Sequence, residues 1–352
     1  MDQPDNIAAQ LHAARTLEVG GRANEATGLL RRVAGSGNVA AVAALGKHLL
    51  IYRPDCAGEG LNTLSAAAQR GDGESARLLS VFIAEGIGFP QNWRAALAAL
   101  QHAAELGWQA AQSELRFLVT EFGRTRALAN PDSEARRWGA LVESIDVSHW
   151  LQAPPGSLIS SAPRILFVKN FASPAICERL IELARPRMQA AQIYDRESGK
   201  TRYDGTRTNS DCPIILPFSD LVLALVRARI AALIRMPVPF FETPTMLHYK
   251  PGETFAPHHD YLDDSKPGFS AEIAQNGQRV VTFLLYLNDG FEGGETEFPL
   301  VGVRCKGNKG DALCFWNVLP NGSPDRQTIH AGLPPTQGEK WLLSQWVRNI
   351  PM

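Results

Sequence analysis

Two residues in the stretch from Leu247 to Tyr261, His258 and Asp260, have the types and the spacing of metal ligands. Side chains alternate between the faces of a β-strand, so these two would point one way and His259 the other. An imidazole beside a carboxylate supplies two ligands of the facial triad of two histidines and one carboxylate, which holds Fe(II) with coordination positions left open. The third ligand must come from elsewhere, and the candidate is His330.

A His-x-Asp pattern is short enough to occur by chance, and an ordinary hydrogen-bonded histidine would explain His258 alone. Lys340 lies ten residues after His330. If His330 ends one strand and Lys340 begins the antiparallel next one, both can point into one cavity. A buried lysine is costly unless an anion pairs with it. The pair therefore favours a site for a dicarboxylate, and a surface lysine before an apolar strand is the alternative.

Three aromatic residues could line the same cavity. Tyr249 follows the strand that leads towards His258. Tyr286 lies on a later expected strand, on the same face as Thr282 and Leu284. Both phenols could donate hydrogen bonds to an anion. Trp346 lies on the same strand face as Lys340, six residues on. Packing in the core is the alternative for all three.

Five motifs, in order along the chain, resemble the catalytic domain of the prolyl hydroxylases, which are 2-oxoglutarate- and Fe(II)-dependent oxygenases. They are L-H-Y-K-P-G-E-T-F-A-P-H-H-D-Y, R-V-V-T-F-L-L-Y-L-N-D, G-G-E-T-E-F, K-G-D-A-L-C-F and H-A-G-L-P-P-T-Q-G-E-K-W. The resemblance covers roughly residues 164 to 349.

The resemblance implies an enzyme that hydroxylates a C–H bond with dioxygen and decarboxylates 2-oxoglutarate to succinate and carbon dioxide, with ascorbate as a reductant. Lys340 would anchor the distal carboxylate of 2-oxoglutarate, helped by Tyr249 and Tyr286, while Thr296 and Phe298 would be structural. The residues expected to bind iron are His258, Asp260 and His330.

The segment that corresponds to the family's substrate-gripping loop reads Y-D-G-T-R-T-N-S-D, and Arg207 resembles a family arginine in it. A solvated loop arginine is the alternative. Two departures from the family are His259, where an aromatic or apolar residue is common, and Pro335, where valine is usual. The polar stretch from Asp263 to Gln278 is expected to be a flexible loop.

The first 125 residues are rich in alanine, leucine, arginine and glycine. Three glycines, Gly37, Gly71 and Gly107, recur at spacings of 34 and 36 residues between apolar helical stretches. This period is typical of stacked helix-turn-helix units. The region resembles the Sel1-like branch of the tetratricopeptide repeats, and an irregular alanine-rich helical domain is the alternative. The histidines at 12, 48 and 102 lack ligand spacing and are expected at the surface or in packing.

The expected domains are helical repeats at 1–125, a linker at 126–163 with a turn at Asn130-Pro131-Asp132, and an oxygenase domain at 164–352. Ser173-Pro174 predicts the start of a helix in that domain, and residues 218–236 predict another. Residues 194–211 are expected to form a loop. Many short strands separated by turn residues favour a double-sheet jelly roll. They are expected near 242–249, 280–287, 295–298, 311–315 and 342–347.

The 352-residue chain carries 35 basic and 36 acidic residues, so bulk electrostatics suggest neither a nucleic-acid nor a membrane partner. Its apolar stretches are shorter than a membrane span, and no secretory signal is visible. Five scattered cysteines fit a reduced, cytoplasmic protein. We expect a prolyl residue of a peptide or protein as the substrate, recruited by the repeats. The alternatives are a free amino acid or other small molecule, or an inactive repeat-bearing adaptor.

Overall fold

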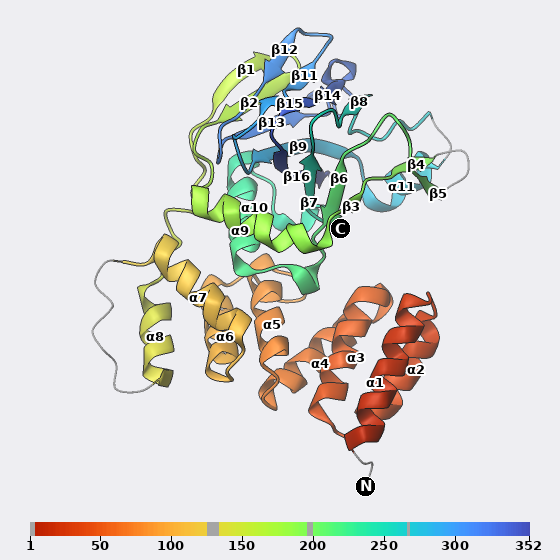
Figure 1. Ribbon diagram of the computed structural model, residues 1–352, viewed down its shortest axis with the longest axis vertical. Coiled ribbons are helices and arrows are strands. Elements are labelled where there is room, and N and C mark those ends of the chain that lie inside the picture. Colours follow the sequence, from red (N-terminus) through yellow and green to blue (C-terminus); the bar gives the residue numbers. More distant parts are fainter. Residues whose placement is uncertain (1–3, 125–133, 196–199, 266–267) are drawn as a thin grey trace. The chain divides into compact units, whose positions relative to one another are not determined.

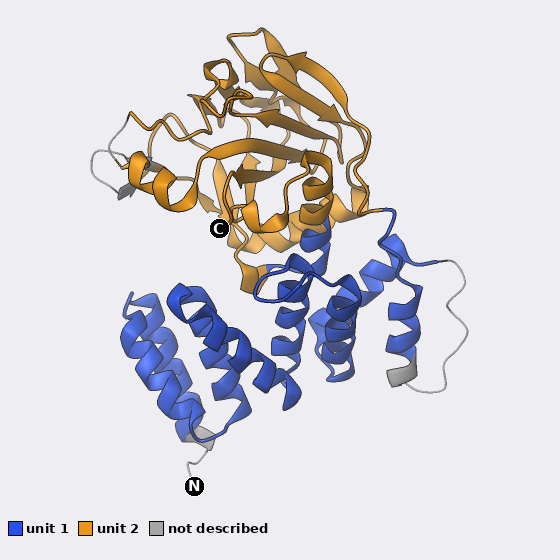
Figure 2. Cartoon of the chain, turned by 180° about the vertical axis from the view of Figure 1, so that it is seen from behind, with its two compact units in different colours: residues 1–149, 219–225 blue, residues 150–218, 226–352 orange. Residues whose placement is uncertain are grey.

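The computed structural model describes residues 4–124, 134–195, 200–265 and 268–352. The turn expected at Asn130-Pro131-Asp132 lies outside these residues. The chain forms two compact units (Figure 2), the first from Met1–His149 with Ser219–Leu225 and the second from Trp150–Phe218 with Val226–Met352.

The first unit consists of successive antiparallel helices (Figure 1). They are α1 (Pro4–Val19), α2 (Ala23–Ala34), α3 (Val39–Tyr52), α4 (Ala57–Gln69), α5 (Gly73–Glu85), α6 (Trp93–Glu105), α7 (Gln109–Phe122) and α8 (Glu134–Ser144).

The three recurring glycines lie in the turns between α2 and α3, between α4 and α5, and between α6 and α7, as predicted. Gly37, Gly71 and Gly107 have φ angles of +77°, +95° and +81°, a region that only glycine adopts without strain. The next residue caps the following helix in two of these turns: Asn38 accepts a hydrogen bond from the Ala41 N–H and Asp72 from the Ser75 N–H. The helix-turn-helix prediction is confirmed for these pairs.

Two elements occur in the stretch that was expected to be a linker. Helix α8 buries Trp138, and strand β1 (Ser157–Ser161) pairs with β2 (Arg164–Val168). The folded sheet therefore begins before residue 164. Strand β1 was hard to predict, because its side chains are mostly exposed and its residues show no alternation of apolar and polar types.

The second unit is built around two antiparallel sheets. In the larger sheet the order is β1, β2, β13 (Ala312–Trp316), β9 (Arg279–Tyr286), β16 (Lys340–Arg348), β7 (Thr245–Tyr249), β6 (Ser210–Pro213) and β3 (Gln189–Ala190). In the smaller sheet it is β12 (Val303–Cys305), β11 (Thr296–Phe298), β14 (His330–Gly332) and β8 (Phe255–His258).

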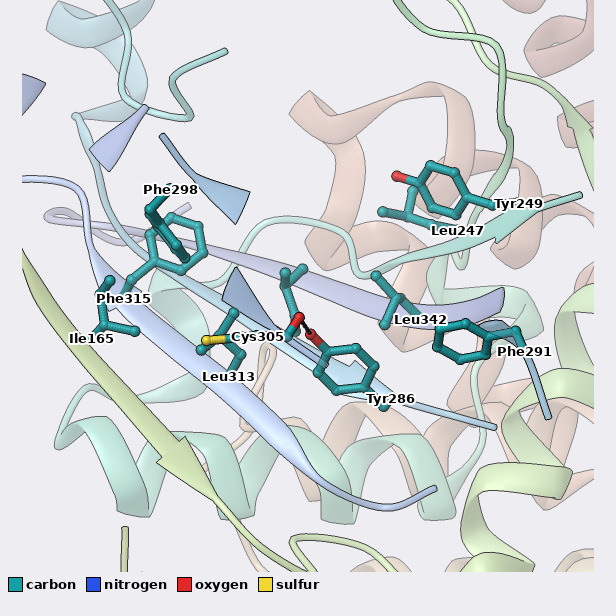
Figure 3. Close-up of a cluster of buried hydrophobic side chains, with 11 residues drawn as sticks. Ile165, Leu247, Tyr249, Tyr286, Phe291, Phe298, Cys305, Leu313, Phe315 and Leu342 are labelled. Atoms are coloured by element: carbon teal, nitrogen blue, oxygen red, sulfur yellow. Dashed lines mark hydrogen bonds between the residues drawn. The ribbon is translucent and has the colours of Figure 1, made fainter. Parts of the chain in front are cut away.

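The apolar core joins these two sheets. Phe298 of β11 packs edge-on against Phe315 of β13, with ring centroids 5.1 Å apart, and Figure 3 shows both rings among the other buried side chains. Two sheets with a shared core agree with the expected jelly roll. Two short pairs complete the strands: β10 (Glu292–Gly293) with β15 (Pro335–Gln337), and β4 (Ile193–Asp195) with β5 (Lys200–Arg202).

Three α-helices accompany the sheets: α9 (Pro174–Ala184), α10 (Leu221–Ile234) and α11 (Phe269–Asn276). The predicted start of α9 is confirmed, because the Ser173 side chain accepts a hydrogen bond from the Ile176 N–H. Short 3₁₀ turns lie at Pro54–Cys56, Arg185–Arg187, Leu216–Phe218, Val238–Phe240 and Arg326–Thr328.

Two expected loops contain regular structure. Helix α11 lies within the stretch 263–278, where buried Phe269 and the ion pair between Glu272 and Arg348 attach it to the unit. The stretch 194–211 contributes to β4, β5 and β6. These strands are three or four residues long, which is too short to show a period.

Candidate active site

Strand pairing brings the predicted metal ligands together. His258 ends β8 and His330 begins β14, and the two residues are direct partners in the antiparallel ladder. Asp260 follows β8, with its Oδ1 3.6 Å from His258 Nε2 and its Oδ2 3.5 Å from His330 Nε2. One candidate ligand atom from each residue lies within 4.8 Å of the other two. This spacing allows one cation to contact all three.

Backbone carbonyls orient both imidazoles. His258 Nδ1 lies 2.9 Å from the Ala256 oxygen, and His330 Nδ1 lies 3.0 Å from the Thr328 oxygen. A carbonyl can only accept, so each Nδ1 carries the proton and each Nε2 keeps its lone pair. Histidine ligands of metals are commonly held in this way.

A side-chain relay fixes the carboxylate. Asp260 is 4% exposed, and its Oδ2 accepts a hydrogen bond of 2.7 Å from the Thr282 hydroxyl. The Thr282 oxygen accepts in turn from Asn317 Nδ2 at 3.0 Å. Thr282 belongs to β9 and Asn317 follows β13, so the large sheet holds a ligand that the loop after β8 supplies.

Burial and neighbouring charges set the protonation of the triad. Burial lowers the pKa of His258 to about 3, and His330 disfavours its charged form further. Burial alone would raise the pKa of Asp260, but the two imidazoles and the Thr282 hydroxyl outweigh it and lower the pKa. At neutral pH His258 therefore presents an imidazole nitrogen and Asp260 a carboxylate, donors suited to Fe(II).

The triad opens into a cavity of about 150 Å³ that Lys340 also lines. Lys340 is fully buried, and its Nζ has no hydrogen-bond partner among the described residues. Burial lowers the pKa of Lys340 to about 7, although Glu295 partly offsets this. A buried amine facing a cavity without a partner fits an anionic ligand.

The two tyrosines near Lys340 differ in their surroundings. Tyr249 pairs with Lys340 across β7 and β16 and lines the cavity, and burial raises its pKa so that the phenol stays protonated. Tyr286 is not among the cavity-lining residues. Its hydroxyl donates to the Cys305 carbonyl at 3.1 Å (Figure 3). The same hydroxyl lies 3.3 Å from Thr296 Oγ1.

These contacts correct two expectations. The single hydroxyl proton of Tyr286 is committed to a backbone carbonyl, so Tyr286 supports the cavity wall. Thr296 lines the cavity, although it was expected to be only structural. The alternation of Thr296 and Phe298 on one face of β11 was the available signal, because the face that buries Phe298 also carries the threonine.

Both candidate substrate residues line the cavity. The Arg207 side chain is 12% exposed and therefore differs from a solvated loop arginine. The Arg279 guanidinium stacks on the Trp346 ring, with its carbon 3.6 Å from the ring centroid. The Trp346 indole Nε1 has no hydrogen-bond partner in the described parts of the chain. His259 is half-buried, with its Nε2 3.0 Å from the Arg326 carbonyl oxygen, and is not a lining residue.

Asp211 and Phe255 are among the lining residues that sequence reasoning missed. Asp211 lies on β6, within the stretch that was expected to be a loop. The Phe255 ring stacks on the His258 ring with centroids 3.6 Å apart. Strand alternation places residues three apart on opposite faces, so this contact was not predictable from the sequence.

Comparison with known proteins agrees with this geometry. Residues 244–348 match the 2OG-Fe(II) oxygenase superfamily. Prolyl 4-hydroxylase 1 of Arabidopsis thaliana is 34% identical over 228 residues, which cover 58% of this chain and 79% of the relative. Prolyl 4-hydroxylase 13 of the same plant is 30% identical over 249 residues, covering 65% and 84%.

A viral collagen prolyl hydroxylase from Paramecium Bursaria Chlorella virus-1, solved with 2OG, is 26% identical and covers 53% of this chain and 96% of its own, with a TM-score of 0.41. The matched family and the sequence relatives define the class of 2OG-Fe(II) oxygenases.

The chain belongs to the prolyl 4-hydroxylase-like members of this class. It is a 2-oxoglutarate-dependent dioxygenase, and the family implies Fe(II), 2-oxoglutarate and dioxygen as its cofactor and cosubstrates. Where the structure describes the chain, its helices are too short or too polar to cross a lipid bilayer.

Proposed function

We propose that this enzyme hydroxylates a prolyl residue in a peptide or protein and converts 2-oxoglutarate to succinate and carbon dioxide. The observation that carries the proposal is one cavity lined by the His258, Asp260 and His330 side chains together with Lys340, whose amine has no hydrogen-bond partner among the described residues. The prolyl 4-hydroxylase relatives support the prolyl substrate.

His258, Asp260 and His330 would hold Fe(II), which supplies the redox chemistry with dioxygen and 2-oxoglutarate when bound. Their donor set fits this metal, because the Nε2 atoms and the carboxylate converge in a buried site. Thr282 and the two backbone carbonyls keep the ligands in place before a metal arrives.

Lys340 would bind the distal carboxylate of 2-oxoglutarate, and a carboxylate there would restore the amine to its protonated state. Tyr249 and Thr296 line the same cavity and have hydroxyls that can donate to the anion. The apolar side chains of Leu247, Leu284 and Leu342 would exclude water from the reacting groups. The proposal includes ascorbate as a reductant of the enzyme.

Arg207 and Trp346 would contact the peptide, since each contributes to the cavity wall and retains hydrogen-bond donors. The helical unit would recruit the protein that contains the target, as Sel1-like repeats. Its support is the repeated glycine turns with a helix-turn-helix period. A cytoplasmic setting fits the free state of all five cysteines.

The test is turnover of proline-containing peptides with Fe(II), 2-oxoglutarate and dioxygen. Succinate should form together with a peptide that has gained one oxygen atom at proline. A substrate search would use the inactive His258→Ala protein to capture binding partners, followed by mass spectrometry of proteins treated with active enzyme. If the enzyme hydroxylates other substrates but no prolyl peptide, the prolyl assignment is refuted.

A further inference from the structure

The cavity contains two cationic side chains that differ in their partners, Lys340 and Arg207. Lys340 Nζ has no hydrogen-bond partner among the described residues. Arg207 donates to Asn209 Oδ1, to the Gln192 carbonyl and to Asp211 Oδ2, the last at 2.7 Å. The lysine therefore lacks a carboxylate that an incoming ligand can supply, whereas the arginine has one built into the protein.

The ion pair of Arg207 and Asp211 lies close to the triad. The Arg207 guanidinium carbon is 4.9 Å from the Phe255 ring centroid, and the Phe255 ring stacks on His258. Asp211 lies on β6 opposite Leu247 of β7, and both residues line the cavity. The pair thus forms part of the wall beside the candidate metal ligands.

Because Arg207 and Asp211 are mostly buried, their charges act strongly on a ligand in the cavity. The two side chains are 12% and 22% exposed, so solvent screens them weakly. Burial raises the pKa of Asp211, and Arg207 partly offsets this effect. As an ionised pair they contribute no net charge to the cavity. A guanidinium has five N–H donors, so Arg207 can still bind an uncharged acceptor such as a peptide carbonyl.

We propose that Asp211 determines substrate specificity: it cancels the charge of Arg207, so that the site selects peptides uncharged next to the hydroxylated residue. An acidic side chain entering there would lose its hydration and would find the cation already paired, beside a carboxylate of like charge. A basic side chain would meet the guanidinium. This inference rests on the proposed function and names the class of its peptide substrate.

The test compares peptides in which proline alternates with alanine, glutamate or lysine. Each is assayed for turnover, and for binding under anaerobic conditions in the presence of Fe(II) and 2-oxoglutarate. The variants are Asp211→Asn, Arg207→Gln and the double variant. Glu297→Gln is the matched control, since Glu297 is 21% exposed, accepts from Arg304 at 2.7 Å and is not a cavity-lining residue.

The wild type and Glu297→Gln should prefer the alanine peptide. Asp211→Asn should raise the preference for glutamate over alanine by about tenfold, the size of one charge-assisted hydrogen bond. Arg207→Gln should shift the preference towards lysine, and the double variant should return to alanine. A purely structural role for Asp211 would lower all three activities together without this reversal.

An unchanged ratio of glutamate to alanine in Asp211→Asn would overturn the inference while leaving prolyl hydroxylation intact. Binding that follows the predicted charge order without hydroxylation would support the inference and refute the proposed reaction. Absence of peptide binding by every form would overturn both.

Discussion

The two ends of the catalytic cavity differ in how completely the protein satisfies its own polar groups. At the triad, each histidine donates to a backbone carbonyl and Asp260 accepts from Thr282. At the other end, the Lys340 amine is buried without a hydrogen-bond partner in the described chain. A preorganised metal site should lose its function outright when a ligand is removed. The lysine end should respond mainly through its affinity for the dicarboxylate.

The largest expected effect is at the triad. His258→Ala removes one of the three proposed iron ligands, so we expect loss of all measurable succinate formation at any 2-oxoglutarate concentration. His259→Ala is the control, because His259 neighbours His258 in the sequence but is not a cavity-lining residue. The measurement is 2-oxoglutarate-dependent succinate production with a proline peptide. Full activity in His258→Ala would remove this residue from the metal site.

The next effect is at the opposite end. Lys340→Ala should raise the KM for 2-oxoglutarate about 10- to 100-fold, because a hydrogen bond to a charged group contributes roughly 1.5–3 kcal/mol. The kcat at saturating 2-oxoglutarate should change less than KM. Lys309→Ala serves as the control, since Lys309 pairs with Glu178 outside the cavity. Equal KM values for wild type and Lys340→Ala would contradict the anchoring role.

A smaller effect should follow from loosening one ligand without removing it. Thr282→Val keeps the side-chain shape but deletes the hydroxyl that donates to Asp260. We expect about a 10- to 100-fold weaker apparent affinity for Fe(II), the usual range for partners of metal ligands, with activity recovered at high Fe(II). Titration of the metal-free protein with Fe(II) under anaerobic conditions measures this change. Activity lost equally at every Fe(II) concentration would contradict a positioning role.

The pH dependence should also distinguish the two ends. The pKa of buried Lys340 is about 7 without an anion, so the amine loses its proton above that pH. Binding a carboxylate requires the charged form, and the dissociation constant of 2-oxoglutarate should rise by up to about tenfold per pH unit above pH 7. Calorimetric titration should show proton uptake on binding there. The same affinity at pH 7 and pH 9 would exclude this linkage.

Without a bound anion, the stability of the protein should change with pH in the opposite direction to its affinity for 2-oxoglutarate. The folded pKa of Lys340 lies below the ordinary value of 10.5, so the unfolded chain binds the proton more tightly. Without a bound anion, the free energy of unfolding should therefore fall as the pH drops from about 10 to about 7. Lys340→Met should remove this dependence, and thermal unfolding as a function of pH would measure it.

Most of the candidate site could be predicted from the sequence, because its residues follow the two-residue period of β-strands. His258 and Asp260 are two apart, and Lys340 and Trp346 occupy one face of a nine-residue strand, so their convergence followed from alternation and pairing. The sequence could not show that Thr296, and not Tyr286, lines the cavity. Which neighbouring hydroxyl faces the ligand depends on the position of the Cys305 carbonyl, which belongs to another strand.

The hardest elements to predict were those that are short or that depend on contacts with distant parts of the sequence. Strand β6 contains only four residues and ends in Pro213, so Asp211 looked like part of a loop until its pairing with β7 was visible. Helix α11 depends on Arg348, 76 residues from Glu272 in the sequence, for one of its ion pairs. The repeated turns at Gly37, Gly71 and Gly107 were predictable, because a positive φ strongly favours glycine.

We propose that the triad and Lys340 together support prolyl hydroxylation that is coupled to the decarboxylation of 2-oxoglutarate. The most direct measurement is the ratio of succinate to hydroxyproline formed by Fe(II)-loaded enzyme with the proline–alanine peptide under air. The account predicts one hydroxyproline for each succinate and neither product from His258→Ala. Succinate with no hydroxyproline, or hydroxyproline from His258→Ala, would contradict it.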